Sequence, residues 1–434
     1  MTTLLEASIR PFDDPSKGVE TLDFLVVGIG ASAGGLEACR KLMDVLPENN
    51  GMAFVLVQHL DPNHESLLVC LLASHTKMNV LQIKDGMLIE PNHLYIIPPG
   101  AYLSTVKGFL HISPPQARHG ARLPFDYFLQ TLALDYGERA ICLVLSGTGT
   151  DGSFGSRAVK AKGGLVIAQE PSEAGFDGMP KSAIAAGAVD FVLPVERMPD
   201  ALQNYARAIP VAQKPDEKVG LKTNECMPEI IELLRISSAH DFTHYKPGTL
   251  QRRTERRMAL AAITRNDMGR YLELLRTNPV ELGLLAADLL INVTNFFRDP
   301  KVFDHLAKTV IYDLVGNHVP DHPIRIWSVG CSTGEEVYSL AMVFQEQIAA
   351  CKSNAKLQIF ASDVDADAVA TARDGYYPGT IEADVSTERL ARFFTKEKTG
   401  YRVSRALRSS VVLSVQNVLT DPPFGAVLNW GEVS

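Results

Sequence analysis

Three residues whose types cooperate in nucleophilic catalysis stand at the ends of apolar stretches in the first half of the chain. Ser32 lies within Gly-Ala-Ser-Ala-Gly, a G-x-S-x-G pattern in which a sharp turn between a strand and a helix exposes a serine. His59 ends one apolar run and Asp151 follows another. A serine needs a base to become a nucleophile, and the base needs an acid to hold its tautomer. The set therefore predicts a serine nucleophile with its base and orienting acid.

Each of these residues also has a structural interpretation. The glycines at 28, 30 and 34 are spaced one residue too far apart for a dinucleotide loop, but a plain turn with an incidental serine fits this stretch equally well. A single histidine at a strand end is more often structural, and Asp151, which precedes a glycine, can serve as a turn or helix-capping residue. Rival bases are His64, His75, His93, His111 and His119.

The elements that would position these residues form an alternating pattern. Continuous apolar runs begin near residues 24, 52, 140 and 164, and stretches with helical character separate them. This pattern predicts an α/β fold, a doubly wound and mainly parallel sheet with helices on both faces. Ligands of such sheets bind at the carboxyl ends of the strands, where Ser32, His59 and Asp151 would meet. The N–H groups of residues 33–35, which open a helix, could contribute to an oxyanion hole.

Residues 21–208 resemble the catalytic domain of the chemotaxis protein-glutamate methylesterases, the CheB type. Four stretches carry the resemblance: Gly28-Ile-Gly-Ala-Ser-Ala-Gly-Gly, Val57-Gln-His, Ser146-Gly-Thr-Gly-Thr-Asp-Gly, and Ala168-Gln-Glu followed by Gly178-Met-Pro-Lys. The resemblance implies that Ser32 is the nucleophile, His59 the base and Asp151 the acid. The implied reaction is hydrolysis of glutamate γ-methyl esters on a receptor without a cofactor, with glutamine deamidation as a second activity. Thr148 stands where the family commonly has Met.

Further expectations follow from the N-terminal residues and from the composition. Residues 1–20 form a polar tail without the apolar core of a signal peptide, and we expect no phospho-receiver domain ahead of the esterase and no control through one. The net charge of -8 argues against nucleic acid as a partner. Six scattered cysteines without C-x-x-C spacing predict neither a metal site nor disulfides. No apolar run reaches membrane-spanning length, so we expect a cytoplasmic protein without membrane insertion.

A linker over residues 209–226, rich in proline and charge, should lead into a helical subdomain over 227–298. The predicted helix 248–261 carries four arginines, Arg252, Arg253, Arg256 and Arg257. They favour either a solvated helix face or a docking surface for an acidic partner.

A second glycine turn follows the predicted strand 324–329. The sequence Gly330-Cys-Ser-Thr-Gly-Glu-Glu leads into a long helix, and the next strand, 357–362, ends at Asp363. An acid at that place can bind ribose hydroxyls, although the glycine spacing does not favour NAD. An adenosyl cofactor and an unrelated α/β turn fit the pattern about equally, because Glu335 at a helix start is favourable in any case.

Residues from about 227 to 423 resemble the receptor protein-glutamate methyltransferases, the CheR type. The stretches that carry the resemblance are Asp241-Phe-Thr-His-Tyr-Lys-Pro-Gly, Asn292-Val-Thr-Asn-Phe-Phe-Arg, Ser332-Thr-Gly-Glu-Glu, Ala361-Ser-Asp-Val-Asp and Val415-Gln-Asn-Val-Leu. The resemblance implies S-adenosylmethionine as cofactor, with a methyl-accepting receptor as partner that the arginine helix helps to dock. The residues implied to contact the cofactor are Asn292, Thr294, Arg298, Glu335, Asp363 and Asn417.

After Asp421-Pro-Pro-Phe the sequence leaves the family pattern, so we expect residues 299–434 to be an incomplete, partial Rossmann-like cofactor domain. An exposed apolar edge at strand 324–329 and a defective transferase would follow, and a shifted frame or truncated gene is one hypothesis for it. The leading prediction is a bifunctional receptor-modifying protein with opposing esterase and methyltransferase modules. The alternatives are a non-catalytic signalling scaffold that binds receptor helices, and a general serine esterase with a cofactor-binding regulatory module.

Overall fold

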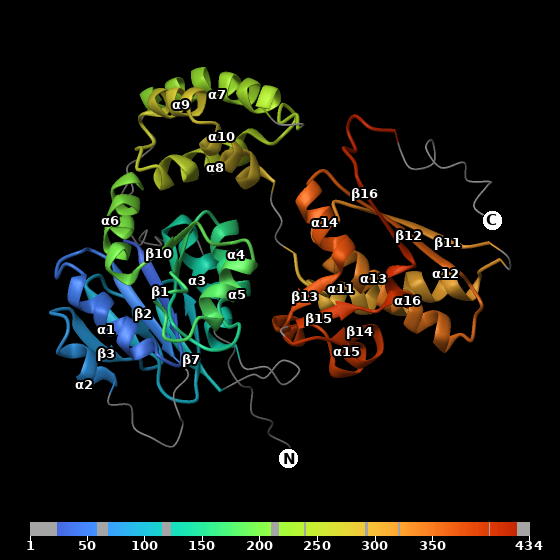
Figure 1. Cartoon of the computed structure of the whole chain (residues 1–434), viewed down its shortest axis with the longest axis horizontal. Helices are drawn as coiled ribbons and strands as arrows, with labels where there is room; N and C mark the ends of the chain where they lie inside the picture. The colour runs from blue at the N-terminus through green and yellow to red at the C-terminus, as the bar shows by residue number, and fades with distance from the viewer. Residues whose placement is uncertain are drawn as a thin grey trace, which may run out of the picture.

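A computed structural model describes residues 24–58, 68–114, 123–209, 217–237, 240–290, 294–319, 322–398 and 400–422. Three units follow one another along the chain: an N-terminal unit (24–209), a helical unit (217–290) and a C-terminal unit (294–422). In Figure 1 the N-terminal unit runs from blue to green, the helical unit stands above it, and the orange to red C-terminal unit lies beside it.

A seven-stranded sheet forms the middle of the N-terminal unit, in the order β10-β9-β8-β1-β2-β5-β3 with all pairs parallel. The strands are β1 (Val26–Ala31), β2 (Ala53–Gln58), β3 (Asn79–Gln82), β5 (His93–Ile96), β8 (Ala140–Val144), β9 (Leu165–Gln169) and β10 (Phe191–Leu193). The predicted parallel sheet is thus confirmed.

Helices cover both faces of this sheet. On one face α1 (Gly35–Val45), α2 (Leu68–Ala73) and α6 (Met198–Ala208) share a core with alternate strand residues such as Val27 and Ile29. On the other face Val26 and Val144 pack with the remaining helices, which are α3 (Pro124–Tyr136), α4 (Ser153–Ala161) and α5 (Gly178–Ala185). Single 3-10 turns, η1 (Gly137–Arg139) and η2 (Val195–Arg197), precede β8 and α6. The two cores show the doubly wound arrangement that continuous apolar strands require.

A small antiparallel sheet that the sequence did not reveal lies against α3. It consists of β4 (Met87–Leu88), β6 (Tyr102–Val106) and β7 (Phe109–Ser113), in the order β4-β7-β6. The turn between β6 and β7 is tied to α3, because the Asp135 carboxylate accepts hydrogen bonds from the N–H groups of Lys107 (2.8 Å) and Gly108 (2.9 Å).

The helical unit contains α7 (Glu217–Ser237), α8 (Pro247–Leu260), α9 (Met268–Thr277) and α10 (Pro279–Leu289) around a core that includes Phe242, Tyr271 and Leu285. Two helix starts are capped by side chains: Asp267 accepts from the Arg270 N–H, and Asn278 accepts from two N–H groups of α10. Helix α7 begins at Glu217, inside the stretch predicted as linker, so the linker prediction was too long at its C-terminal end.

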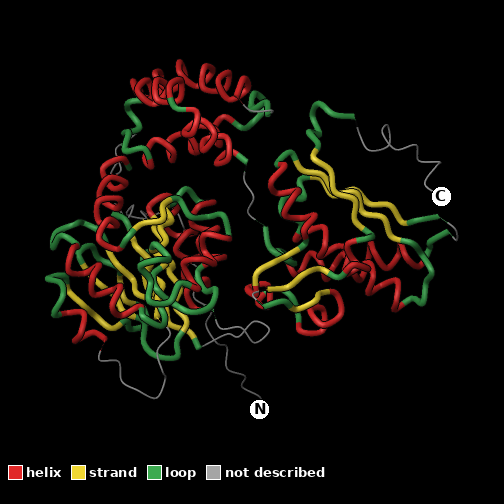
Figure 2. Tube along the Cα trace, in the orientation of Figure 1, coloured by secondary structure: helices red, strands yellow, loops and turns green. Residues whose placement is uncertain are grey.

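The C-terminal unit has a parallel sheet in the order β11-β12-β16 (Figure 2, yellow). Its strands are β11 (Ile324–Val329), β12 (Leu357–Asp363) and β16 (Val411–Val415). A second, antiparallel sheet contains β13 (Tyr376–Pro378), β14 (Phe394–Lys396) and β15 (Gly400–Val403). The helices are α11 (Pro300–Leu306), the π-helical turn η3 (Ala307–Ile311), α12 (Tyr312–Gly316), α13 (Glu335–Ala350), α14 (Ala366–Asp374), the 3-10 turn η4 (Gly379–Ala383), α15 (Thr387–Phe393) and α16 (Arg405–Arg408).

Strand β11 stands at one edge of its sheet within the described residues, pairing with β12 alone. Ile324 and Ile326 face the core with α13, whereas Trp327 and Val329 are 39% and 49% exposed on the other face. An apolar edge strand was expected here from the sequence.

Candidate functional site

Ser32 is the first residue after β1, at the carboxyl edge of the seven-stranded sheet. Its N–H donates to the Ser146 carbonyl after β8 (3.1 Å), and its carbonyl accepts from the Gly35 N–H (2.9 Å). Gly35 is therefore not a free donor for an oxyanion hole. The left-handed residue of the turn is Gly34, with φ 73°, and Ser32 is not among the described non-glycine residues with positive φ. The strain that a hydrolase elbow places on its serine is absent at Ser32.

The glycines of this stretch are explained by close packing. A Cβ atom on Gly30 would lie 2.1 Å from the Phe125 ring, and one on Gly28 would lie 3.0 Å from the Phe128 ring. Both glycines therefore allow α3 to lie directly on β1. The glycine spacing is thus explained by packing and does not require a bound phosphate. Ser32 is then the reactive side chain of this turn.

A second loop touches the serine. A Cβ atom on Gly147 would lie 3.0 Å from the Ser32 Cβ and 2.2 Å from the Met179 Sδ, so backbone, serine and methionine meet there. The loop is braced by Ser146, whose N–H donates to the Gln169 Oε1 (2.8 Å) and whose Oγ accepts from the Phe176 N–H (3.0 Å). The loops after β1, β8 and β9 are thus held together around Ser32.

Asp151 ends this second loop and is 5% exposed. Its Oδ2 accepts from the Phe125 N–H (3.0 Å) and its Oδ1 from the Asp126 N–H (2.8 Å), both at the start of α3. The positive end of a helix stabilises an anion there. The capping interpretation of Asp151 is therefore correct for α3, and this capping fixes the carboxylate as an orienting acid would need to be.

Asp126 is a second buried carboxyl beside Asp151 that the sequence analysis did not single out. Its Oδ1 accepts from the Gly155 N–H (2.6 Å), while its Oδ2 has no hydrogen-bond partner in the described residues. Burial, together with the neighbouring charge of Asp151, raises the pKa of Asp126 well above its ordinary value. No spacing pattern marked it, because its significance comes from the fold around the start of α3.

His59 lies outside the described residues, so its contacts stay a prediction. The preceding residue, Gln58, is the last of β2 and pairs with Ala31, the last of β1. In the sheet, β1 lies between β2 and β8. The strands that precede Ser32, His59 and Asp151 are therefore neighbours.

The described rival histidines are engaged elsewhere. His75 bonds to the Asp44 Oδ1 (2.8 Å), and His111 pairs with Asp85 (3.5 Å). His93 bonds to the Pro91 carbonyl (2.9 Å) and begins β5, which places it at the amino edge of the sheet. His64 and His119 lie outside the described residues.

The second glycine turn connects β11 to α13. Gly330 and Ser332 have φ values of 72° and 47°, and the turn is braced by Asp363, the last residue of β12. The Asp363 Oδ2 accepts from the Ser332 N–H (2.7 Å), and its Oδ1 accepts from the Asp365 N–H (3.0 Å). Asn417 follows β16 at the same edge, where its Oδ1 accepts from the Leu419 N–H (3.0 Å).

Glu335 is the first residue of α13 and is 4% exposed. Its Oε2 accepts from the Thr333 hydroxyl (2.6 Å), and its Oε1 lies 3.7 Å from the Arg157 Nη1 of the N-terminal unit. Burial raises the pKa of Glu335, which Arg157 and Thr333 partly offset. The structure therefore confirms that Glu335 starts a helix, and it adds a cation from another unit.

The predicted cofactor residues fall into two groups. Thr294 and Arg298 line a cavity of about 380 Å³, and Glu335 lines another of about 460 Å³. The segment of Thr294 and Arg298 is anchored to α13, because the Phe297 N–H donates to the Ser339 Oγ (3.1 Å). Asn292 lies outside the described residues. Glu335, Asp363 and Asn417 lie at the carboxyl edge of the β11-β12-β16 sheet, where their oxygens suit the hydroxyl and amine groups of an adenosyl amino acid.

Three of the four arginines of α8 are buried, which shows that the solvated-face interpretation was wrong for them. The Arg256 Nη2 pairs with the Asp190 Oδ2 (2.6 Å), and its Nη1 pairs with the Asp288 Oδ2 (2.5 Å). Arg253 donates to carbonyls at the end of α4, and Arg257 pairs with Glu281 (2.6 Å). Arg252 is exposed. The acidic partners of this helix thus lie within the chain, and receptor docking by α8 stays a prediction.

The described part of the chain contains no group of His, Cys, Asp and Glu that could hold a metal ion. In that same part, no helix combines the length and apolar character that crossing a bilayer requires.

The three units correspond to three family models. Residues 27–202 match the CheB methylesterases, residues 227–290 the all-alpha domain of the CheR methyltransferases, and residues 292–428 the S-adenosylmethionine-binding domain of the same methyltransferases. The chain thus combines a region that matches the CheB methylesterases with two following regions that match the CheR methyltransferases.

The chain is also similar to individual proteins. An uncharacterized 104.1 kDa protein of Rhodobacter capsulatus is 39% identical over 378 residues, which cover 82% of this chain and 39% of that protein. A protein-glutamate methylesterase/protein-glutamine glutaminase of Pyrococcus abyssi is 32% identical over 182 residues, 41% of this chain and 50% of that protein. The chain therefore spans half or less of the length of these relatives. The crystal structure of the Thermotoga maritima CheB methylesterase catalytic domain has 32% identity and a TM-score of 0.40, covering 42% of this chain and 98% of that one.

Proposed function

We propose that the N-terminal unit hydrolyses protein glutamate γ-methyl esters, with Ser32 as nucleophile, His59 as base and Asp151 as orienting acid. The observation that carries the proposal is the loop from Gly147 to Asp151. It touches Ser32 at one end, and at its other end both carboxylate oxygens of Asp151 are fixed by the start of α3.

The reaction would proceed in two balanced steps. The Ser32 Oγ bonds to the ester carbon while His59 accepts its proton, and the same proton passes to the methoxy oxygen, so that methanol leaves. Water then gives a proton to His59 and attacks the acyl-serine, and His59 passes that proton to the departing Ser32 Oγ. The released glutamic acid side chain loses its own proton to solvent and becomes the carboxylate. Asp151 holds the imidazole in one tautomer. An amide in place of the ester would release ammonia, as the glutaminase name of the Pyrococcus relative suggests.

Methanol release from a methylated receptor substrate tests this function. The full chain should release methanol, and Ser32→Ala should abolish the release. Ser172→Ala is a matched control, because Ser172 lies in the loop after β9 with its hydroxyl directed at Glu170. Hydrolysis of simple esters without action on the methylated protein would support a general esterase instead. Full activity of Ser32→Ala would contradict the proposal.

We further propose that the C-terminal unit, as the methyltransferase module, binds S-adenosylmethionine through Asn292, Thr294, Arg298, Glu335, Asp363 and Asn417. The cofactor would supply the methyl group for a glutamate carboxylate. Glu335 and Asp363 would accept hydrogen bonds from its hydroxyl and amine groups, and Arg298 would pair with its carboxylate. Calorimetric titration with S-adenosylhomocysteine, with Asp363→Asn as the test variant, measures this binding. Equal affinity of wild type and Asp363→Asn would contradict the assignment of Asp363.

A further inference from the structure

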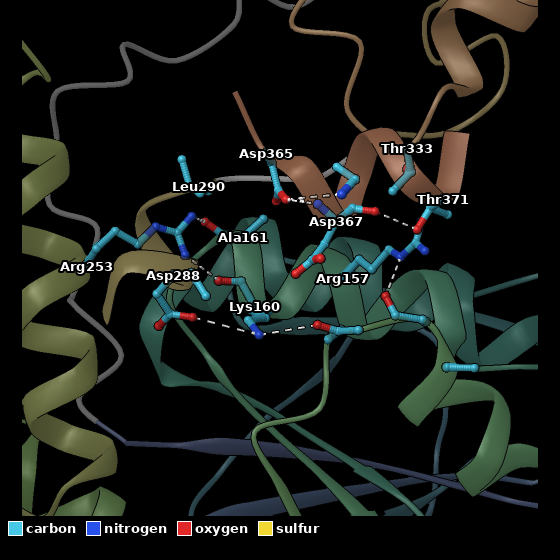
Figure 3. A pocket seen from close by; sticks show the side chains of 16 residues that line it. Arg157, Lys160, Ala161, Arg253, Asp288, Leu290, Thr333, Asp365, Asp367 and Thr371 are labelled. Atoms are coloured by element: carbon cyan, nitrogen blue, oxygen red, sulfur yellow. Dashed lines mark hydrogen bonds and ion pairs between the residues drawn. The ribbon is translucent and has the colours of Figure 1, made fainter. Parts of the chain in front are cut away.

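Arg157 extends from α4 of the N-terminal unit to the predicted cofactor site of the C-terminal unit. Its Nε donates to the Ala186 carbonyl (3.0 Å), which fixes the guanidinium within its own unit, and its side chain is 19% exposed. Figure 3 shows Arg157 pointing away from α4 toward Thr333 and Thr371 of the C-terminal unit. From this position the Nη1 faces the Glu335 Oε1 at 3.7 Å.

Both carboxylate oxygens of Glu335 are engaged in this arrangement. Oε2 holds the Thr333 hydroxyl at 2.6 Å, and Oε1 faces Arg157. Thr333 belongs to the same turn as Glu335, and its carbonyl is fixed by the Tyr377 hydroxyl (2.7 Å). Each carboxylate oxygen can accept a further hydrogen bond, but a ligand group that takes the position in front of Oε1 displaces Arg157, which is the more distant partner and comes from another unit.

Three cavities at the junction of the units share Arg157 as a lining residue. Arg157 lines the cavity of about 460 Å³ that contains Glu335, the cavity of about 380 Å³ that contains Thr294 and Arg298, and a third of about 330 Å³. Arg157 thus lines both cavities that contain predicted cofactor residues.

The charges around the junction are consistent with Arg157 as the cation directed at Glu335. Lys160, one turn further along α4, pairs with Asp190 (3.9 Å) of the N-terminal unit and Asp288 (3.8 Å) of the helical unit. Arg253 is directed at the carbonyls of Lys160 and Ala161. On the opposite side, Asp365 and Asp367 line the third cavity together with Arg157.

We infer that Arg157 and the cofactor compete for Glu335, so that docking of the esterase unit and cofactor binding by the methyltransferase unit oppose each other. This inference rests on the proposed cofactor site. Coupling between two equilibria is reciprocal: docking weakens cofactor binding by the same factor by which bound cofactor weakens docking. Within one chain, docking of the esterase unit is thereby linked directly to cofactor binding by the methyltransferase unit.

The test compares the affinity of S-adenosylhomocysteine for three full-length variants by calorimetry. Arg157→Gln should bind about 5-fold or more tightly than wild type, the lower end of typical couplings between sites. Arg157→Lys keeps a cation on α4 and should remain closer to wild type. Arg207→Gln, at an exposed position on α6, is the matched control and should leave the affinity unchanged. Circular dichroism melting curves establish that each variant is folded.

Hydrogen exchange in the wild type supplies a readout other than affinity. Saturation with S-adenosylhomocysteine should speed exchange at the end of α4 and around Ala186, because the docked contact is lost. Equal affinity of Arg157→Gln and wild type, or weaker binding by Arg157→Gln, would overturn the inference and leave the cofactor site intact. Failure of every variant to bind would overturn the proposed cofactor site, and the competition with it.

Discussion

Arg256 of the helical unit and Asp190 of the N-terminal unit form an ion pair at 2.6 Å with side chains that are 1% and 2% exposed. The same guanidinium reaches Asp288 and the Gly164 carbonyl. One side chain therefore joins α8 and α10 to the end of the seven-stranded sheet. This relationship makes the arginine helix a structural link between the units.

Arg256→Ala should lower the free energy of unfolding by about 3–5 kcal/mol, because it leaves two buried carboxylates with only the more distant Lys160 ammonium as a cation. Urea unfolding of the full chain measures this change. Arg252→Ala, at the exposed position of the same helix, is the control and should stay within about 0.5 kcal/mol. Equal effects of the two substitutions would show that the buried pair does not stabilise the junction.

Asp126→Asn should remove a pH dependence of stability. Burial and the charge of Asp151 raise the pKa of Asp126 in the folded state, so the folded chain holds this proton more tightly than the unfolded chain. The resulting stabilisation is complete below the unfolded pKa and is lost as pH rises through the folded pKa. The amide keeps the acceptor for Gly155 and never ionises, so the variant should gain stability relative to the wild type as pH rises.

Melting temperatures of wild type and Asp126→Asn between pH 4 and pH 8 check this prediction. The two curves should converge at the acid end and separate as pH rises. Asp135→Asn is a control, since that carboxylate receives its hydrogen bonds at the surface turn after β6. Parallel curves for wild type and Asp126→Asn over the whole range would contradict the assignment of a raised pKa.

Gly147→Ala should impair catalysis more than folding. The added Cβ would lie 2.2 Å from the Met179 Sδ and 3.0 Å from the Ser32 Cβ, so the methionine must move and the serine must give by a few tenths of an ångström. A displacement of reacting groups by about 1 Å can lower a rate ~10²-fold, so we expect a smaller loss of rate here. Steady-state methanol release and urea unfolding measure the two effects. Gly248→Ala has open space for its Cβ and should change neither quantity much. A loss of activity no larger than that of Gly248→Ala would show that Ser32 tolerates the shift.

The parallel sheet and the edge that carries Ser32 and Asp151 were predictable, because long apolar strands and glycine turns are local features of the sequence. Helix α7 was partly missed since its first residues lie in a stretch rich in charge and near Pro210, where local propensity is weak. The antiparallel strands β4, β6, β7 and β13 to β15 are too short for a clear alternation. Their pairing depends on contacts with distant segments.

The contacts between units could not be predicted from local patterns. The arginines of α8 look like a solvated face in sequence, and their partners, Asp190 and Asp288, lie far along the chain. Arg157 is an ordinary basic residue on an amphipathic helix, and only the fold brings it to Glu335. Asp126 likewise owes its raised pKa to burial and to the approach of Asp151, both of which the fold produces. Residues that act through tertiary contacts leave little local trace in a single sequence.

The central claim is that Ser32 is a nucleophile activated by His59 at the carboxyl edge of the sheet. Labelling of the full chain by a fluorophosphonate, mapped by mass spectrometry, tests it most directly. We predict that the label attaches to Ser32, that His59→Ala slows labelling at least ~10²-fold, the lower end of general-base assistance, and that His93→Ala leaves the rate unchanged. Labelling at another residue, or an undiminished rate in His59→Ala, would contradict the account.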